Sequence, residues 1–183
     1  MMEASREDEE QLERPGTLTE TEIATIQHTW AKVYGRKEDV GVAVLIRLFT
    51  SFPLAKQYFS QFRHMQDPGE MRASVQLRQH ALRVMNALHT LVENAHDAEK
   101  TAAVLRTVAK SHALRHRVEP TYFRILAGVI QEVLGEAFPE AFDAEAQGAW
   151  SKLLGVVYWH ITKVYGEISW SKHTSSFYWP VPH

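Results

Sequence analysis

Hydrophobic residues recur every three or four positions along most of this chain, and this spacing places them on one face of a helix. The first such run covers residues 23–33 and ends at Gly35. It is preceded by Thr19 and, three residues later, by Glu22. These residue types at this spacing form a capping box, in which each side chain accepts a hydrogen bond from the other residue's backbone amide. The pattern therefore predicts a helix that begins just after Thr19.

The same periodicity continues along the rest of the chain, and no segment reads convincingly as a strand. About seven or eight helices of unequal length with short joints suit crossed-helix packing better than an up-and-down bundle. We expect a disordered acidic arm over residues 1–17, an all-α domain over residues 18–168 and a flexible tail over residues 169–183. The later helices are predicted at 38–52, 53–62 (a short turn), 74–93, a short segment ending at His112, 120–138 and 143–167, with turn-rich stretches at 64–70 and 94–100.

The composition is typical of a globular domain, with 45% hydrophobic and 23% charged residues. A length of 183 residues suits one domain. The net charge of −2 argues against a dedicated nucleic-acid-binding protein. No stretch approaches the ~18 apolar residues of a membrane span, and no apolar run follows the acidic N-terminus. We therefore expect a cytoplasmic protein, with the nucleus as a second location.

The chain contains no cysteine. This excludes disulfides, iron–sulfur clusters, thiolate-ligated haem and haem attached covalently through cysteine. Any dimer must therefore be noncovalent, and we expect either a monomer or a noncovalent homodimer.

Two histidines lie on the apolar faces of different predicted helices. His80 shares its face with Leu77 and Val84, and His112 follows Leu105 and Val108 at helical spacing. A single histidine in such a position is more often a core residue than a ligand, but a buried imidazole needs a hydrogen-bond partner or a metal. Two imidazoles that face the interior from two helices can hold a haem iron between them.

Other chemistry finds less support in the sequence. A di-metal site in a helix bundle needs two Glu-x-x-His motifs, and only Glu93 with His96 fits that spacing, at a helix end. No phosphate-binding loop, zinc-protease motif or serine-nucleophile motif is present. The aromatic group Tyr58, Phe59 and Phe62 is either ordinary core or a wall against a flat cofactor.

Several segments together resemble the globin family, most closely its cytoglobin branch. The resemblance is carried by His80 and His112 and by the segments 38–43, 52–62 and 112–120, and it extends over about residues 18–170. It implies a globin fold around haem b, with His112 as the proximal iron ligand. His80 is then the distal histidine, the catalytic residue and a reversible sixth ligand.

The resemblance also implies roles for other side chains. Phe59 packs on the porphyrin, Leu45 and Val84 shape the gas pocket, and Arg83 and His116 lie near the haem propionates. The second ring nitrogen of His112 is expected to donate to the Ser111 hydroxyl or to a backbone carbonyl one turn back. The full set of expected haem contacts is Leu45, Phe59, Phe62, His80, Arg83, Val84, Val108, His112, His116 and Val118.

The resemblance to cytoglobins implies a redox-active protein that binds O2, NO and CO. It also implies that the protein acts as a nitric oxide dioxygenase with an external reductase. Nitrite reduction and superoxide or peroxide chemistry follow from the same resemblance. Two alternatives stay open: an oxygen carrier or store, and a haem-based sensor that uses the aromatic tail at residues 177–180. In one respect the chain departs from the branch, because Lys37 and Leu82 occupy positions where many cytoglobins have cysteines.

Overall fold

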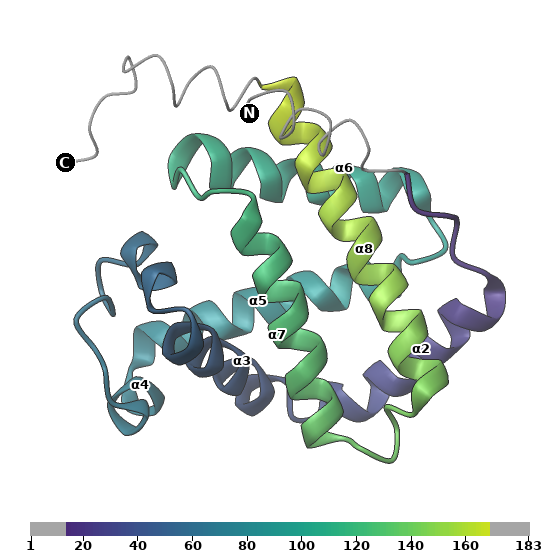
Figure 1. Cartoon of the computed structure of the whole chain (residues 1–183). Helices are drawn as coiled ribbons and strands as arrows, with labels where there is room; N and C mark the ends of the chain where they lie inside the picture. Colours follow the sequence, from purple (N-terminus) through teal and green to yellow (C-terminus); the bar gives the residue numbers. More distant parts are fainter. Residues whose placement is uncertain (1–13, 169–183) are drawn as a thin grey trace, which may run out of the picture.

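The computed structural model describes residues 14–168, which form helices and their connections without a strand (Figure 1). Residues 1–13 and 169–183 lie outside the described part, and with them most of the predicted arm and the whole predicted tail. None of the described helices is long and apolar enough to cross a membrane. The elements are α2 (Glu20–Tyr34), α3 (Lys37–Ser51), the 3-10 helix η1 (Pro53–Tyr58), α4 (Pro68–Ala73), α5 (Val75–Glu93), α6 (Ala98–Lys110), the π-helix η2 (Ser111–Arg115), α7 (Thr121–Ala137) and α8 (Ala144–Glu167).

Helix starts follow from residue types that the sequence displays. Thr19 Oγ1 accepts from the Glu22 amide at 3.1 Å, and Glu22 Oε1 accepts from the Thr19 amide at 2.8 Å, so the predicted capping box is confirmed. Asp143 caps α8 in the same manner, because its carboxylate accepts from the Ala146 amide at 2.9 Å. Such a cap stabilises a helix by about 1 kcal/mol, which is enough to fix where each helix begins.

The end of α3 differs from the sequence prediction. The predicted helix runs to Phe52, but α3 ends at Ser51 and Phe52 is 40% exposed. The reason is Pro53, whose ring disfavours a helical conformation in the preceding residue. Phe52 accordingly has φ −131° and ψ 73°.

The turn-rich stretch at 64–70 contains the start of a short helix, α4, that the sequence prediction missed. The Asp67 side chain accepts from the Glu70 amide at 3.3 Å, and Pro68 occupies the first helical position. Both residue types are as typical of helix starts as of turns. The composition of this stretch therefore could not distinguish the two structures.

Helices α3 and α5 cross in very close contact at Gly41. A Cβ atom at this position would lie 2.7 Å from Met85 Cγ and 3.0 Å from the carbonyl oxygen of Ala81. Only glycine permits such an approach without displacement of the neighbours. Because Ala81 follows His80 directly in α5, this crossing helps to fix the position of His80.

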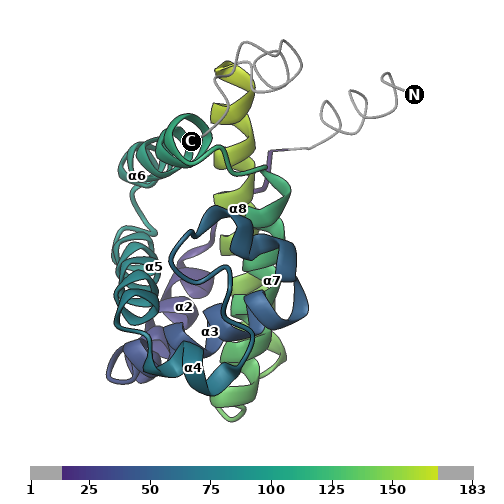
Figure 2. The ribbon, with the colours of Figure 1, turned by 90° about the vertical axis from the view of Figure 1, so that its left-hand side faces the viewer.

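The buried apolar side chains form two separate clusters. The larger one joins α2, α3, α5, α7 and the first half of α8. The smaller one joins Leu91 of α5 to side chains of α6, η2 and the last turns of α8. In Figures 1 and 2, α6 and the end of α8 lie at one end of the molecule, away from α3 and α4. A domain usually has one main core and smaller satellite clusters, and here the smaller cluster includes Ala113, the residue after His112.

Candidate functional site

His112 lies in η2, and a hydrogen bond fixes its ring. Its Nδ1 lies 2.8 Å from the carbonyl oxygen of Val108, one turn back. Because a carbonyl oxygen only accepts, Nδ1 carries the ring proton and Nε2 keeps a free lone pair. Phe123 of α7 supports the imidazole edge-on, with ring centroids 5.1 Å apart. Of the two partners expected for the second ring nitrogen, the structure has the backbone carbonyl and not Ser111.

The backbone around His112 departs from regular α-helix. The His116 amide donates to the Ser111 carbonyl at 3.3 Å, and the Val118 amide donates to the His112 carbonyl at 2.9 Å. Between these two bonds Arg117 adopts φ 56°, a left-handed conformation that is uncommon outside glycine. Short π-helical turns of this kind occur frequently at functional sites.

His80 projects from α5 toward the same region. Its imidazole centroid lies 4.8 Å from that of Phe59, which meets it edge-on. Burial is the largest cause that lowers the pKa of His80 to about 4, and the charge of His112 is the second. The two histidines therefore lie close enough to interact electrostatically. Within residues 14–168, His80 has no hydrogen-bond partner.

Phe59 is held by an aromatic group that includes two more phenylalanines. Its centroid lies 5.2 Å from that of Phe62 and 5.3 Å from that of Phe49. Phe62 is fully buried in the larger core cluster, as is Leu45 of α3. Phe49 and Phe62 therefore contact Phe59, which in turn meets His80, and Phe59 itself is only half-buried.

The aliphatic residues that were expected to contact haem differ in how far they are buried. Val118 is buried, whereas Val84 of α5 and Val108 of α6 are only half-buried, although both lie on the inner faces of their helices. Val84 comes one turn after His80, and Val108 one turn before His112.

This arrangement fits a flat, apolar, metal-bearing cofactor better than it fits a finished core. The buried clusters are separate, and half-buried valines accompany both histidines. One imidazole presents a free lone pair and the other has no partner in the described part of the chain. Neutral imidazoles are common iron ligands, and a haem has the shape to be held between two helices. The donor set and the divided core are therefore those expected for haem.

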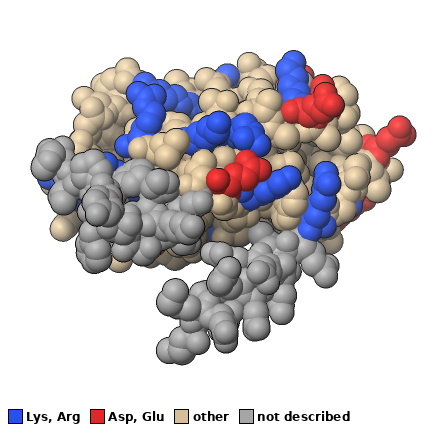
Figure 3. Space-filling model, turned by 90° about the horizontal axis from the view of Figure 1, so that it is seen from above, with Lys and Arg blue, Asp and Glu red and all other residues tan. Residues whose placement is uncertain are grey.

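The two polar residues that were expected near the haem propionates lie at the surface. Arg83 and His116 are both exposed, and the His116 ring centroid lies 5.7 Å from that of His112. The charge of Arg83 contributes to the lowered pKa of His80, after burial and His112. Viewed from above, most of the described surface is neither acidic nor basic, and Lys and Arg side chains are scattered over it together with small groups of Asp and Glu (Figure 3).

Three aromatic residues next to the site make contacts that the sequence did not predict, although Tyr58 was already a candidate for core or for a wall against a flat cofactor. Phe123 supports His112, Tyr165 donates to the Val118 carbonyl at 2.7 Å, and Tyr58 accepts from the Glu119 amide at 3.3 Å. Phe123 and Tyr58 could be read as apolar positions, but the hydroxyl contacts join residues 47 and 61 positions apart. No local pattern signals such contacts.

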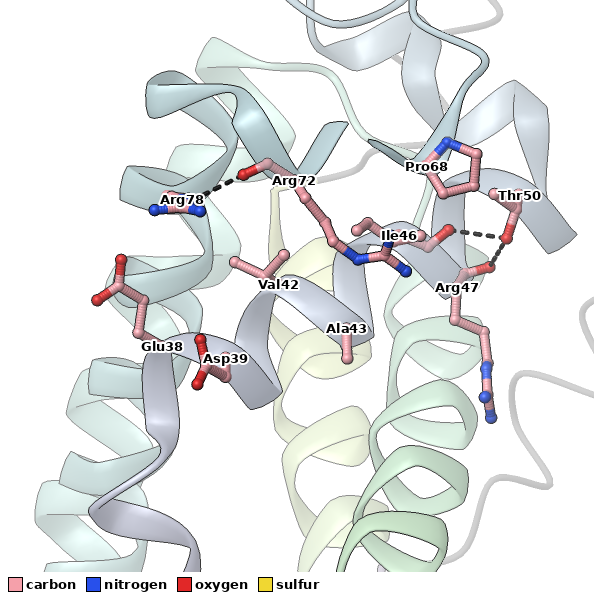
Figure 4. A pocket seen from close by; sticks show the side chains of 10 residues that line it. All are labelled: Glu38, Asp39, Val42, Ala43, Ile46, Arg47, Thr50, Pro68, Arg72 and Arg78. Carbon is pink, nitrogen blue, oxygen red and sulfur yellow. Dashed lines mark hydrogen bonds between the residues drawn. The ribbon is translucent and has the colours of Figure 1, made fainter. Parts of the chain in front are cut away.

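A surface groove elsewhere on the molecule does not include the histidines. It lies between α3, α4 and the start of α5, with Val42 and Ile46 at its floor and Arg47, Arg72 and Arg78 among its charged residues (Figure 4). Arg78 Nε donates to the Arg72 carbonyl at 2.8 Å, and Arg47 pairs with Glu132 of α7 at 2.8 Å. Half of the ten residues that line the groove are charged and none is a histidine, which does not suit a flat apolar metal-bearing cofactor.

Comparison with known proteins identifies the family of this chain. The Globin family matches residues 42–161. Cytoglobin-2 of Danio rerio is 57% identical over 177 residues, which covers 96% of this chain and 99% of the relative. Cytoglobin-1 of the same organism is 55% identical over 157 residues, covering 85% and 90%. Globin-1 of Petromyzon marinus is 38% identical over 117 residues, covering 64% and 78%. The chain therefore belongs to the globin family as a cytoglobin-type globin, a haem protein that binds oxygen or other gases.

Proposed function

We propose that this chain holds haem b between His112 and His80 and converts nitric oxide and oxygen to nitrate. His112 is the permanent iron ligand and His80 a reversible sixth ligand. One observation carries the proposal: His112 presents a free Nε2 lone pair close to a second, neutral imidazole that has no partner among residues 14–168. The absence of cysteine excludes haem attached covalently through cysteine and is compatible with the noncovalent haem b that we propose.

The hydrogen bond from His112 to Val108 has two effects on the proximal ligand. It fixes the ring orientation, and it selects the tautomer whose Nε2 lone pair is available. A hydrogen bond from the remote nitrogen also makes an imidazole a stronger ligand. Burial lowers the pKa of His112 and so favours the neutral ring that ligation requires.

His80 is suited to two uses that exclude each other. Its pKa of about 4 keeps the imidazole neutral at pH 7, with one N–H and one lone pair. If the ring nitrogen that faces the iron carries the lone pair, it can bind the iron. If the same nitrogen carries the N–H, it can donate a hydrogen bond to a gas molecule beside it. The two uses need opposite tautomers, and a gas must compete with His80 for the same place.

When bound, haem supplies an iron atom that binds gases and changes between ferrous and ferric states. The overall conversion joins one nitric oxide and one oxygen with one electron to give nitrate, so an external reductase must supply that electron. The half-buried Phe59, Val84 and Val108 would exclude water from the region between the histidines, which strengthens hydrogen bonds made there. Nitrite would be a further ligand of the same site.

The test uses three histidine variants of the full chain. His112→Ala should lose most of its haem, and His80→Leu should keep haem but change the visible spectrum of the gas-free ferrous protein from low-spin to high-spin. His96→Ala is the matched control, because His96 is exposed and lies between α5 and α6. Full haem in His112→Ala would contradict the assignment of the proximal ligand.

Catalysis is tested separately from binding. With a reductase and excess NADH, the unmodified protein should form many equivalents of nitrate per haem from nitric oxide and oxygen. Reversible oxygen binding with no more than one equivalent of nitrate would contradict the dioxygenase and leave an oxygen carrier or store.

A further inference from the structure

Tyr58, the last residue of η1, joins two segments that are far apart in the sequence. Its hydroxyl accepts a hydrogen bond from the Glu119 amide at 3.3 Å. Its ring meets that of Tyr122, in the first turn of α7, edge-on with centroids 5.3 Å apart. Burial is the main cause that raises the pKa of the Tyr58 hydroxyl, so the group stays protonated at neutral pH.

The two segments that Tyr58 joins each lead directly to one of the paired histidines. On one side, Phe59 is the next residue, and its ring lies 4.8 Å from that of His80. On the other side, Glu119 follows Val118, whose amide donates to the carbonyl oxygen of His112 at 2.9 Å. Tyr58 is therefore a direct structural link between the environments of both histidines.

The two ends of this link are not equally firm. On the Glu119 side, the buried hydroxyl of Tyr165 donates to the Val118 carbonyl at 2.7 Å and so anchors the segment to α8. Arg117, whose backbone has a left-handed φ of 56°, comes immediately before Val118. On the other side, η1 is a 3-10 helix of six residues followed by an irregular stretch. If the link is broken, η1 is the element that gains freedom, and Phe59 moves with it.

We propose that Tyr58 is a positioning residue, which ties η1 to the anchored segment after His112 and thereby holds Phe59 against the imidazole of His80. The proposal rests on the role of His80 in the proposed function. Tyr58 itself need not touch the cofactor or the gas. It restricts the positions that the His80 ring can adopt, and so it sets how often His80 occupies the place that a gas would take.

The experiment compares two single-hydroxyl deletions in the haem-loaded full chain. Tyr58→Phe removes the acceptor for the Glu119 amide and keeps the ring. Tyr122→Phe is the matched control, because it removes a hydroxyl from the other ring of the same pair and leaves the Glu119 bond in place. Three properties are measured: exchange of the Glu119 amide hydrogen, the shape of the infrared band of bound carbon monoxide, and the rate of carbon monoxide binding.

In Tyr58→Phe we expect faster exchange at Glu119, because its amide loses its partner. The infrared band should broaden or split, because that band reports the polar group beside the gas and His80 would adopt more positions. Carbon monoxide should bind about two- to tenfold faster, which corresponds to the usual net contribution of one hydrogen bond. The melting temperature of Tyr58→Phe should lie below that of Tyr122→Phe by no more than about 2–4 °C, which is the shift expected for one hydrogen bond in a chain of this size.

Two results would overturn the proposal. Unchanged Glu119 exchange in Tyr58→Phe would show that the hydrogen bond holds nothing. Faster exchange with the same infrared band and binding rate as Tyr122→Phe would show that the link does not reach His80. A high-spin spectrum in the unmodified gas-free protein would instead contradict the sixth-ligand role of His80, and the exchange and infrared measurements would still decide the role of Tyr58.

Discussion

Gly41→Ala should separate the requirement for close helix packing from the general effect of glycine in a helix. In an exposed helix interior, the change from glycine to alanine is stabilising by about 1 kcal/mol, because alanine restricts the unfolded chain. At Gly41 the added Cβ would lie 2.7 Å from Met85 Cγ and 3.0 Å from the Ala81 carbonyl oxygen. The Met85 side chain can turn away, but the Ala81 carbonyl belongs to the backbone of α5 and can move only with that helix.

Overpacking of this kind costs about 1–3 kcal/mol. With the helix gain of about 1 kcal/mol subtracted, Gly41→Ala should lower the free energy of unfolding by about 1 kcal/mol. Gly148→Ala in α8 is the control, since a Cβ there would meet nothing within 4 Å. It should raise the free energy of unfolding by up to about 1 kcal/mol.

Urea unfolding and thermal melting of both variants test this difference in sign. Each kcal/mol corresponds to about 2–4 °C in melting temperature for a chain of this size. Only Gly41→Ala should also alter the visible spectrum of the haem-loaded protein, because the displaced α5 carries His80. Equal stabilisation by both substitutions would refute the argument that the crossing of α3 and α5 is close-packed at Gly41.

Three further perturbations test individual contacts. Burial lowers the pKa of His80 from 6.5 to about 4, so its contribution to the stability of the haem-free protein is present above pH 6.5 and is lost as pH falls toward 4. The loss is at most about 3 kcal/mol, and urea unfolding of His80→Leu should show a correspondingly smaller decline over that range. Tyr165→Phe removes the donor to the buried Val118 carbonyl and should cost about 1–3 kcal/mol in the same assay; an unchanged midpoint would mean that the carbonyl finds another donor. Asp143→Ala removes the cap that receives the Ala146 amide and should cost about 1 kcal/mol, without any change in the haem spectrum.

Local rules account for much of the fold. The periodic apolar positions and the caps at Thr19 and Asp143 are visible in the sequence, and the structure has helices where they predict them. The same rules miss α4 and the π-helix that contains His112. Turn residues also start short helices, as Asp67 does. The π-helix depends in part on the bond from Val118 to the carbonyl of His112, which forms only once the following segment turns back.

The candidate site, like the fold, can be predicted from the sequence only in part. Sequence places His80 and His112 on inner helix faces, but it cannot say that the two helices bring them together. Their approach depends on tertiary features, among them the crossing at Gly41. The choice of Val108 over Ser111 as partner of His112 also depends on the rotation of one side chain. The globin resemblance supplied the pairing that local patterns leave open.

The divided core links the stability of this globin to its cofactor. Fully burying a valine side chain contributes about 1.5–3 kcal/mol, and the protein alone leaves Val84 and Val108 half-buried and the His80 imidazole without a partner among residues 14–168. A flat apolar ligand that covers these side chains recovers the lost burial. Because such a ligand binds only the folded state, it stabilises that state by an amount that rises with the logarithm of the ratio of its free concentration to its Kd. The features that leave the protein without haem incompletely packed are therefore the ones that make haem binding favourable.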